Sequence, residues 1–107
     1  DGACNPYLAF SVMLAAGLDG IEKEYSLPSP VEASVTDMTD DERAELGIEA
    51  LPGNLWESIR IAEQSELVRR ALGEHVFRSF IENKKIEWDS FRAHVTDYEI
   101  ERYLPIL

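Results

Sequence analysis

The 107-residue sequence contains a single cysteine, Cys4, so it cannot form an internal disulfide, and one thiol fits a reducing compartment. Basic residues are also scarce, because ten lysines and arginines stand against 21 aspartates and glutamates, giving a formal net charge of −11. The sequence has no basic stripe that could follow a phosphate backbone or an anionic lipid surface. We therefore expect no nucleic-acid partner and no membrane partner.

The sequence also lacks an apolar run long enough to span a bilayer. Its most apolar stretch, residues 7–18, is shorter than the roughly 20 residues that a spanning helix needs. No basic segment precedes this stretch, so it does not have the pattern of a secretory leader. Because the chain begins at Asp1, we expect an excised or processed piece of a longer cytoplasmic protein.

The apolar stretch predicts a helix over residues 6–23. Asn5 is a favourable N-cap, and Pro6 suits the first helical position, where no backbone donor is needed. Within residues 7–18 only Ser11 and Gly17 are not apolar, so apolar side chains point in every direction around the axis. Such a helix is normally buried on all sides.

Polar caps and glycines mark three further helices, and no segment reads as a strand. Thr39 and Glu42 form a capping-box pattern, and Gly47 ends the short helix that follows. Asn54 caps a third helix, and Ser65 caps a fourth that stops at Gly73. Residues 24–38 carry two prolines and are predicted to form a loop.

The clearest amphipathic helix follows Gly73, with apolar residues at spacings of three, four and seven. These residues, together with Trp56 of the third helix, are expected to form the core: Phe77, Phe80, Ile81, Trp88, Phe91 and Val95. Thr96 and Glu99 form a second capping box before an unusually apolar end of the chain. That end either folds back on the core or docks on another surface.

No group of residues forms a self-sufficient catalytic or metal-binding pattern. Cys4 has no base beside it and is interpreted as a small hydrophobe. His75 and His94 lie near opposite ends of one predicted helix, too far apart to share a metal. Gly17 and Gly20 are interpreted as close packing and a helix stop. The acidic residues around Asp40 are interpreted as a solvated first turn that complements the helix dipole.

Several segments together resemble type I glutamine synthetase. The most specific is DGACNPYLAF at residues 1–10, followed by MLAAGLDGI at residues 13–21. The likeness continues in order through residues 30–31, 41–43, 51–52, 71–75, 80–81, 87–88 and 99–104. Because these segments are collinear and cover nearly the whole chain, residues 1–107 are identified as part of a member of this family.

The resemblance implies a mostly α fold: the helical C-terminal segment, residues 1–107, of a larger α+β catalytic domain. It implies a ligase that forms glutamine from glutamate and ammonia through γ-glutamyl phosphate. The full-length enzyme would use ATP and magnesium or manganese ions. The family's catalytic, cofactor-binding and metal-binding residues match no position here, so the piece is expected to be inert alone. Its expected part is to pack behind the active site through the helix at residues 6–18.

The resemblance also bears on regulation and assembly. Some relatives are adenylylated on a tyrosine in the loop after the first helix, and the matching position here is Thr36, which argues against that control. In the family, the C-terminal segment inserts into the facing ring of a homododecamer. The apolar residues Tyr103, Leu104, Ile106 and Leu107 fit that contact, and the resemblance favours docking over folding back.

Two alternatives stay open on the sequence. The first is a glutamine-synthetase-like ligase that joins glutamate to a polyamine or another amine. The second is a free-standing acidic helical module that binds a partner through its apolar end.

Overall fold

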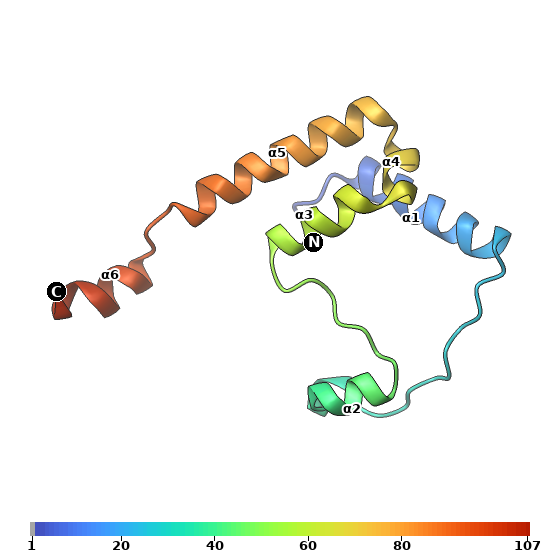
Figure 1. Cartoon of the computed structure of the whole chain (residues 1–107), viewed down its shortest axis with the longest axis horizontal. Helices are drawn as coiled ribbons and strands as arrows, with labels where there is room; N and C mark the ends of the chain where they lie inside the picture. The colour runs from blue at the N-terminus through green and yellow to red at the C-terminus, as the bar shows by residue number, and fades with distance from the viewer. Residues whose placement is uncertain (1) are drawn as a thin grey trace. The chain divides into compact units, whose positions relative to one another are not determined.

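The computed structural model describes residues 2–107, which form helices joined by irregular segments, with no strand among them (Figure 1). The mostly α fold predicted from the sequence is confirmed. The helices in chain order are α1 (Pro6–Glu22), α2 (Asp40–Glu45), α3 (Leu55–Gln64), α4 (Glu66–Leu72), α5 (Glu74–Arg92) and α6 (Asp97–Tyr103). Short 3₁₀ turns, η1 (Val35–Asp37) and η2 (Leu104–Ile106), precede α2 and follow α6. The chain divides into a first unit ending at Gly53 and a second beginning at Asn54.

Helix α1 begins as the sequence predicts. The Asn5 side-chain oxygen accepts hydrogen bonds from the backbone N–H of Tyr7 at 3.0 Å and of Leu8 at 3.3 Å, and Pro6 occupies the first turn. Leu8 and Val12 are half-buried, but its other large apolar side chains are exposed: Tyr7, Phe10, Met13, Leu14, Leu18 and Ile21. Asp19 is the buried residue of this helix. Residues 2–107 therefore do not provide the enclosure that the sequence predicts for α1.

The end of α1 differs from the prediction. Gly20 lies inside the helix. The chain leaves the helix direction only at Glu24, whose φ of 51° is left-handed. The backbone N–H of Tyr25 donates to the Gly20 carbonyl at 3.0 Å, and that of Glu24 donates to Ile21 at 3.3 Å. These are the two bonds of a Schellman motif. Gly17 also makes no close packing, because a Cβ added there would meet no described atom within 4 Å.

Helix α2 is set by its first residues. The backbone N–H of Thr39 donates to the Glu42 carboxylate at 2.7 Å, and the N–H of Glu42 donates to the Thr39 hydroxyl at 3.3 Å. This capping box satisfies donors at the start of the helix. Gly47, with a φ of 68°, follows the helix in the predicted left-handed conformation. The sequence did not predict the 3₁₀ turn η1 just before Thr39.

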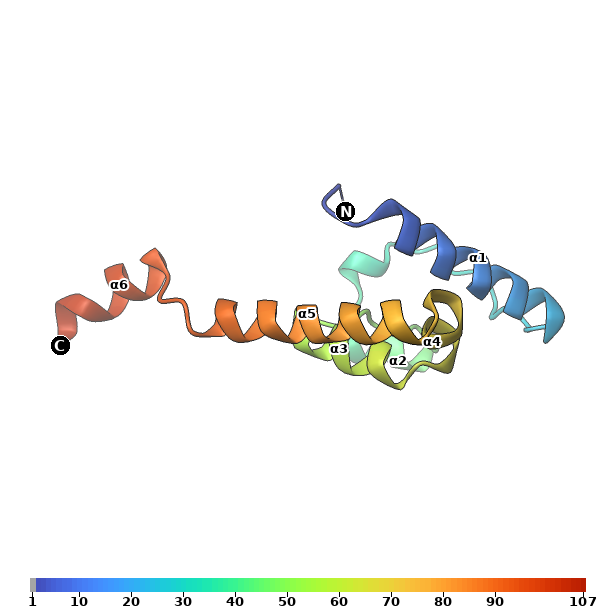
Figure 2. The same ribbon diagram turned by 90° about the horizontal axis from the view of Figure 1, so that it is seen from above.

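The second unit has a small core between α3, α4 and α5. Helix α3 lies alongside α5 in both views, and α4 forms the corner between them (Figures 1 and 2). Ile59 of α3 and Phe77 and Ile81 of α5 are buried. Half-buried apolar residues surround these three: Leu55, Ala62, Val68, Leu72, Phe80 and Trp88. The predicted core residues on the first three turns of α5 are thus confirmed.

The predicted core is wrong at its far end. Phe91 is 65% exposed and Trp56 is 39% exposed, and Val95 lies beyond the end of α5 and is also exposed. The reason is the length of α3, whose first turn reaches only as far as Trp88, where Trp56 stacks on it at 6.4 Å between ring centroids. No element of the described core continues past that point to cover Phe91.

Candidate functional site

The apolar end of the chain is exposed. Thr96 caps α6 through a second capping box, in which its N–H donates to the Glu99 carboxylate at 2.8 Å. The four residues predicted for an oligomer contact follow, and their exposed fractions are 50% for Tyr103, 64% for Leu104, 77% for Ile106 and 100% for Leu107. In both views α6 lies beyond the end of α5, away from α3 and α4 (Figures 1 and 2). The end of the chain therefore does not fold back on its own core.

The predicted regulatory position, Thr36, lies in the middle of η1. Its side chain is exposed, and the turn closes through a hydrogen bond from the Asp37 N–H to the Ser34 carbonyl at 3.2 Å. Because the residue carries a hydroxyl group on a short aliphatic side chain, it has no phenol oxygen for an adenylyl group. Its match to the modified tyrosine of some relatives stays a prediction.

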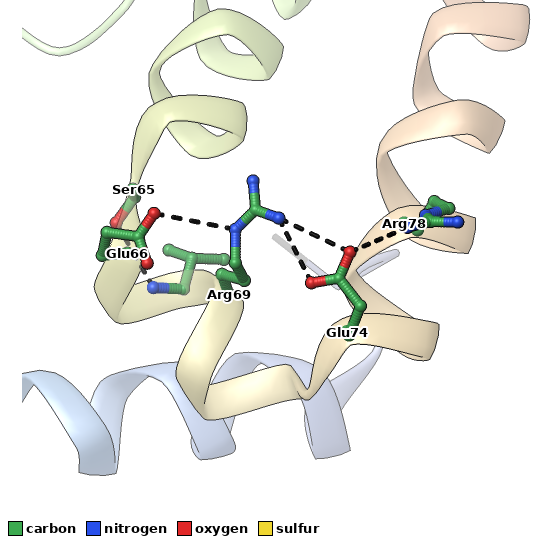
Figure 3. A network of polar contacts seen from close by, with 6 residues as sticks. Ser65, Glu66, Arg69, Glu74 and Arg78 are labelled. Carbon is green, nitrogen blue, oxygen red and sulfur yellow. Dashed lines mark hydrogen bonds and ion pairs between the residues drawn. The ribbon is translucent and has the colours of Figure 1, made fainter.

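A polar network that sequence reasoning missed joins α4 to α5 (Figure 3). Arg69 lies 3.8 Å from Glu66 and 3.2 Å from Glu74, and Arg78 lies 3.0 Å from the same Glu74. Hydrogen bonds from Arg78, and then from Arg69, hold the pKa of Glu74 below its usual value. The network spans the corner at Gly73, whose φ is 74°. Glycine between Arg69 and Glu74 was the only sequence signal of this corner.

The Arg69 guanidinium also covers the core. It lies 4.6 Å from the centroid of the Phe77 ring, a distance at which a cation is attracted to an aromatic face. Beside it is an open hollow of about 270 Å³. Its charged lining balances, with three acidic and three basic side chains: Glu63, Glu74, Glu82, Arg69, Arg78 and Lys85. Lys85 pairs across the helices with Glu63, so this group supports packing of α3 and α4 on α5.

The remaining candidates are not brought together. Cys4 is exposed in the described chain, and its interpretation as a small hydrophobe stays a prediction. His75 and His94 are also exposed, one on the first turn of α5 and the other beyond its end. Among residues 2–107, no three histidine, cysteine, aspartate or glutamate side chains are grouped so that they could hold a metal ion. Nor does this part of the chain contain a helix with the length and hydrophobicity to cross a membrane.

The geometry therefore defines a helical piece whose notable surfaces are apolar and uncovered. Comparison with known proteins gives its family: residues 1–103 match the family described as "Glutamine synthetase, catalytic domain". The chain belongs to this family, as the sequence resemblance predicted.

The curated relatives carry the same name. The chain is 52% identical over 106 residues to a glutamine synthetase of Mycobacterium bovis, covering 99% of this chain and 24% of the relative. It is 48% identical over 104 residues to a glutamine synthetase of Methanocaldococcus jannaschii, covering 97% of this chain and 23% of the relative. A glutamine synthetase of Clostridium saccharobutylicum is 44% identical over 104 residues, with shares of 97% and 24%. The chain thus spans about a quarter of the length of these relatives.

Proposed function

We propose that residues 1–107 are the C-terminal helical part of the catalytic domain of a cytoplasmic glutamine synthetase. The full-length enzyme would join ammonia to the γ-carboxylate of glutamate at the expense of ATP. The observation that carries this proposal is the match of residues 1–103 to the catalytic-domain family, together with 52% identity to a protein of that name. The same family match gives no support to a free-standing interaction module.

In our proposal this piece supplies no catalytic or metal-binding residue. Magnesium or manganese bound with ATP needs several oxygen ligands, and no suitable group of side chains is present within residues 2–107. In our proposal these ligands belong to the remainder of the enzyme, and this piece is inert alone. Its function is to support the active site and the assembly.

Helix α1 is the proposed support of the active site. Most of its large side chains are exposed, with Tyr7 at 83%, Phe10 at 67% and Met13 at 66%. Covering one such side chain fully contributes about 1.5–3 kcal/mol, so a neighbouring layer of the parent domain would be stabilised strongly by this helix. The relatives are about four times longer than this chain, so the parent domain has residues to supply that layer.

The apolar end is the proposed assembly contact. Tyr103, Leu104, Ile106 and Leu107 are exposed at the end of a capped helix, away from their own core. Exposed apolar groups of this kind mark interaction surfaces. We propose that they dock on a second copy of the full-length chain in a homododecamer.

The activity is tested on the full-length protein. It should form glutamine from glutamate, ammonia and ATP when magnesium or manganese is present, whereas the 107-residue chain should form none under the same conditions. Polyamines offered in place of ammonia serve as the matched control. Turnover only with the polyamine would replace the proposal by a γ-glutamyl-amine ligase, and activity of the 107-residue chain alone would contradict it.

The regulatory proposal concerns Thr36. Since this residue offers no phenol, we propose that the enzyme is not adenylylated at position 36. Peptide mass mapping of the enzyme purified from nitrogen-replete cells should show no adenylyl adduct on Thr36. A stoichiometric adduct there would overturn the proposal.

A further inference from the structure

We propose that Asp19, Lys23 and Tyr25 form a clasp that fixes the direction in which the chain leaves α1. The inference concerns the position of residues 24–38, the segment that carries Thr36. It rests on local geometry alone and is independent of the proposed enzymatic activity.

The clasp is built around a buried carboxylate. Asp19 is only 5% exposed, and it lies on the face of α1 where Val12 and Ala15 are half-buried. The Lys23 ammonium donates to its Oδ2 at 2.9 Å, and the Tyr25 hydroxyl donates to the same oxygen at 3.0 Å. A buried carboxylate needs such partners, and hydrogen bonds to a charged group are stronger than neutral ones. Hydrogen bonding to Asp19 correspondingly raises the pKa of Lys23.

The backbone at the same place adopts a conformation that needs support. Glu24 has a φ of 51°, which a residue with a side chain rarely adopts. Tyr25 returns over the helix end, and its ring lies 3.5 Å from where a Cβ on Gly20 would be. That separation is an ordinary van der Waals contact, so the Tyr25 ring packs against the helix at position 20. The side-chain bonds of Tyr25 and Lys23 to Asp19 hold the residues on both sides of Glu24.

The direction set at Tyr25 is carried forward by the sequence. Pro28 and Pro30 follow closely, and each fixes its own φ and restricts the residue before it. Residues 26–34 contain no helix, so they have no helical hydrogen bonds of their own to define a path before η1. The clasp is therefore the point at which α1 determines where the segment starts.

Amide hydrogen exchange in the full-length protein tests this inference, with the Tyr25 amide as the reporter because it donates to Gly20. Tyr25→Phe removes only the hydroxyl, and we expect its amide to exchange about threefold faster or more. Asp19→Ala removes the common acceptor and should accelerate exchange about tenfold. Asp37→Ala makes the same charge change at an exposed position and is the matched control, with no change expected at Tyr25.

The amide of Leu14, inside α1, separates loss of the clasp from loss of the helix. A clasp predicts faster exchange at Tyr25 with Leu14 unchanged in Tyr25→Phe. If Asp19→Ala unfolds α1, the amide of Leu14 also exchanges faster. The Tyr25→Phe variant then tests the clasp by itself. Exchange at Tyr25 within experimental error of the parent in Tyr25→Phe would overturn the proposal, as would equal acceleration by Asp19→Ala and Asp37→Ala.

Discussion

At the scale of the residue, Glu24 occupies a backbone conformation that usually belongs to glycine. Its φ is 51°, and the left-handed region costs a residue with a side chain roughly 1–2 kcal/mol. Gly47 ends α2 in the same region with a φ of 68°, and a Cβ there would meet no atom within 4 Å. The ends of α1 and α2 therefore share a left-handed backbone conformation, which glutamate adopts at one end and glycine at the other.

We expect Glu24→Gly to stabilise the end of α1 by about 1 kcal/mol, because glycine adopts this conformation without strain. Gly47→Ala should destabilise the end of α2 by a similar amount, since no contact offsets the added strain. Site-resolved hydrogen exchange at the amides of Tyr25 and Ile48 measures both. If both substitutions stabilised their helix ends, or both destabilised them, the left-handed conformations assigned to Glu24 and Gly47 would be contradicted.

The two capping boxes make the short helices sensitive to acid. A hydrogen bond from the backbone N–H of Thr39 lowers the pKa of Glu42 below 4.5, and the Thr39 hydroxyl adds to it; Thr96 does the same for Glu99. A lowered pKa means that the carboxylate stabilises the folded helix above the unfolded pKa. This contribution is lost as the pH falls through the folded pKa, so α2 and α6 should fray below about pH 4.5.

Carboxyl chemical shifts measured across an acid titration check this prediction. Glu42 and Glu99 should each titrate with a midpoint below 4.5. Thr39→Ala should raise the midpoint of Glu42 only in part, because the backbone donor of residue 39 remains. A midpoint for Glu42 at or above 4.5 in the parent chain would show that the box is not formed.

These caps could be predicted from the sequence because each is complete within four residues. Asn5, Thr39 and Thr96 all cap the helices that their side-chain chemistry indicates. The end of α1 could not be predicted in the same way. Its signal would have been a glycine at position 24. The residue there is a glutamate, and its neighbours Lys23 and Tyr25 are held by the Asp19 carboxylate.

At the scale of the element, α5 shows what hydrophobic periodicity can and cannot give. The spacing of apolar residues predicted the helix and its buried face, and Phe77 and Ile81 lie there. The same spacing continues to Phe91, which is exposed because α3 ends its cover at Trp88. The periodicity of apolar residues identifies the apolar face of a helix, whereas the burial of that face depends on the length of the partner helix.

A pair of substitutions on this one helix separates the two environments. Phe77→Ala should destabilise the second unit by about 3–5 kcal/mol, because it leaves a cavity in a core of three buried residues. Phe91→Ala removes the same atoms from an exposed position and should cost less than about 1 kcal/mol. Denaturant unfolding followed by circular dichroism gives both values. Similar losses for the two variants would contradict the observed core.

The corner between α4 and α5 was beyond sequence reasoning for a related reason. Arg69 contacts Glu74 and the face of Phe77, which are five and eight residues away on another helix. Charge patterning within one helix does not predict a contact across a glycine corner. The sequence therefore gave the helices of this unit correctly but not the ion pairs that join them.

At the scale of the whole molecule, the exposed apolar surfaces carry the proposed role in assembly. Deleting residues 103–107 from the full-length enzyme should reduce the mass measured by light scattering below that of a dodecamer, because the deletion removes four exposed apolar side chains. A variant shortened by Leu107 alone is the graded control and should have a smaller effect. An unchanged dodecamer in the longer deletion would contradict the proposal.

Family membership was the one functional conclusion that the sequence could give, and it came from the ordered motifs of residues 1–104. Physical reasoning on the side chains found no reaction centre. In the proposed reading the chemistry belongs to parts of the enzyme outside this chain. The same reasoning did find the two uncovered surfaces, α1 and the apolar end, because an excess of apolar residues without polar neighbours can be recognised in any segment.

The stacked indoles of Trp56 and Trp88 have a practical consequence. They are the only two tryptophans in the chain, they lie on different helices, and their ring centroids are 6.4 Å apart with an angle of 23° between planes. Two indole rings at this separation couple their excited states. The coupling gives the chain an optical signal that reports the docking of α3 on α5. Loss of that signal would report separation of the two helices even when each stays helical.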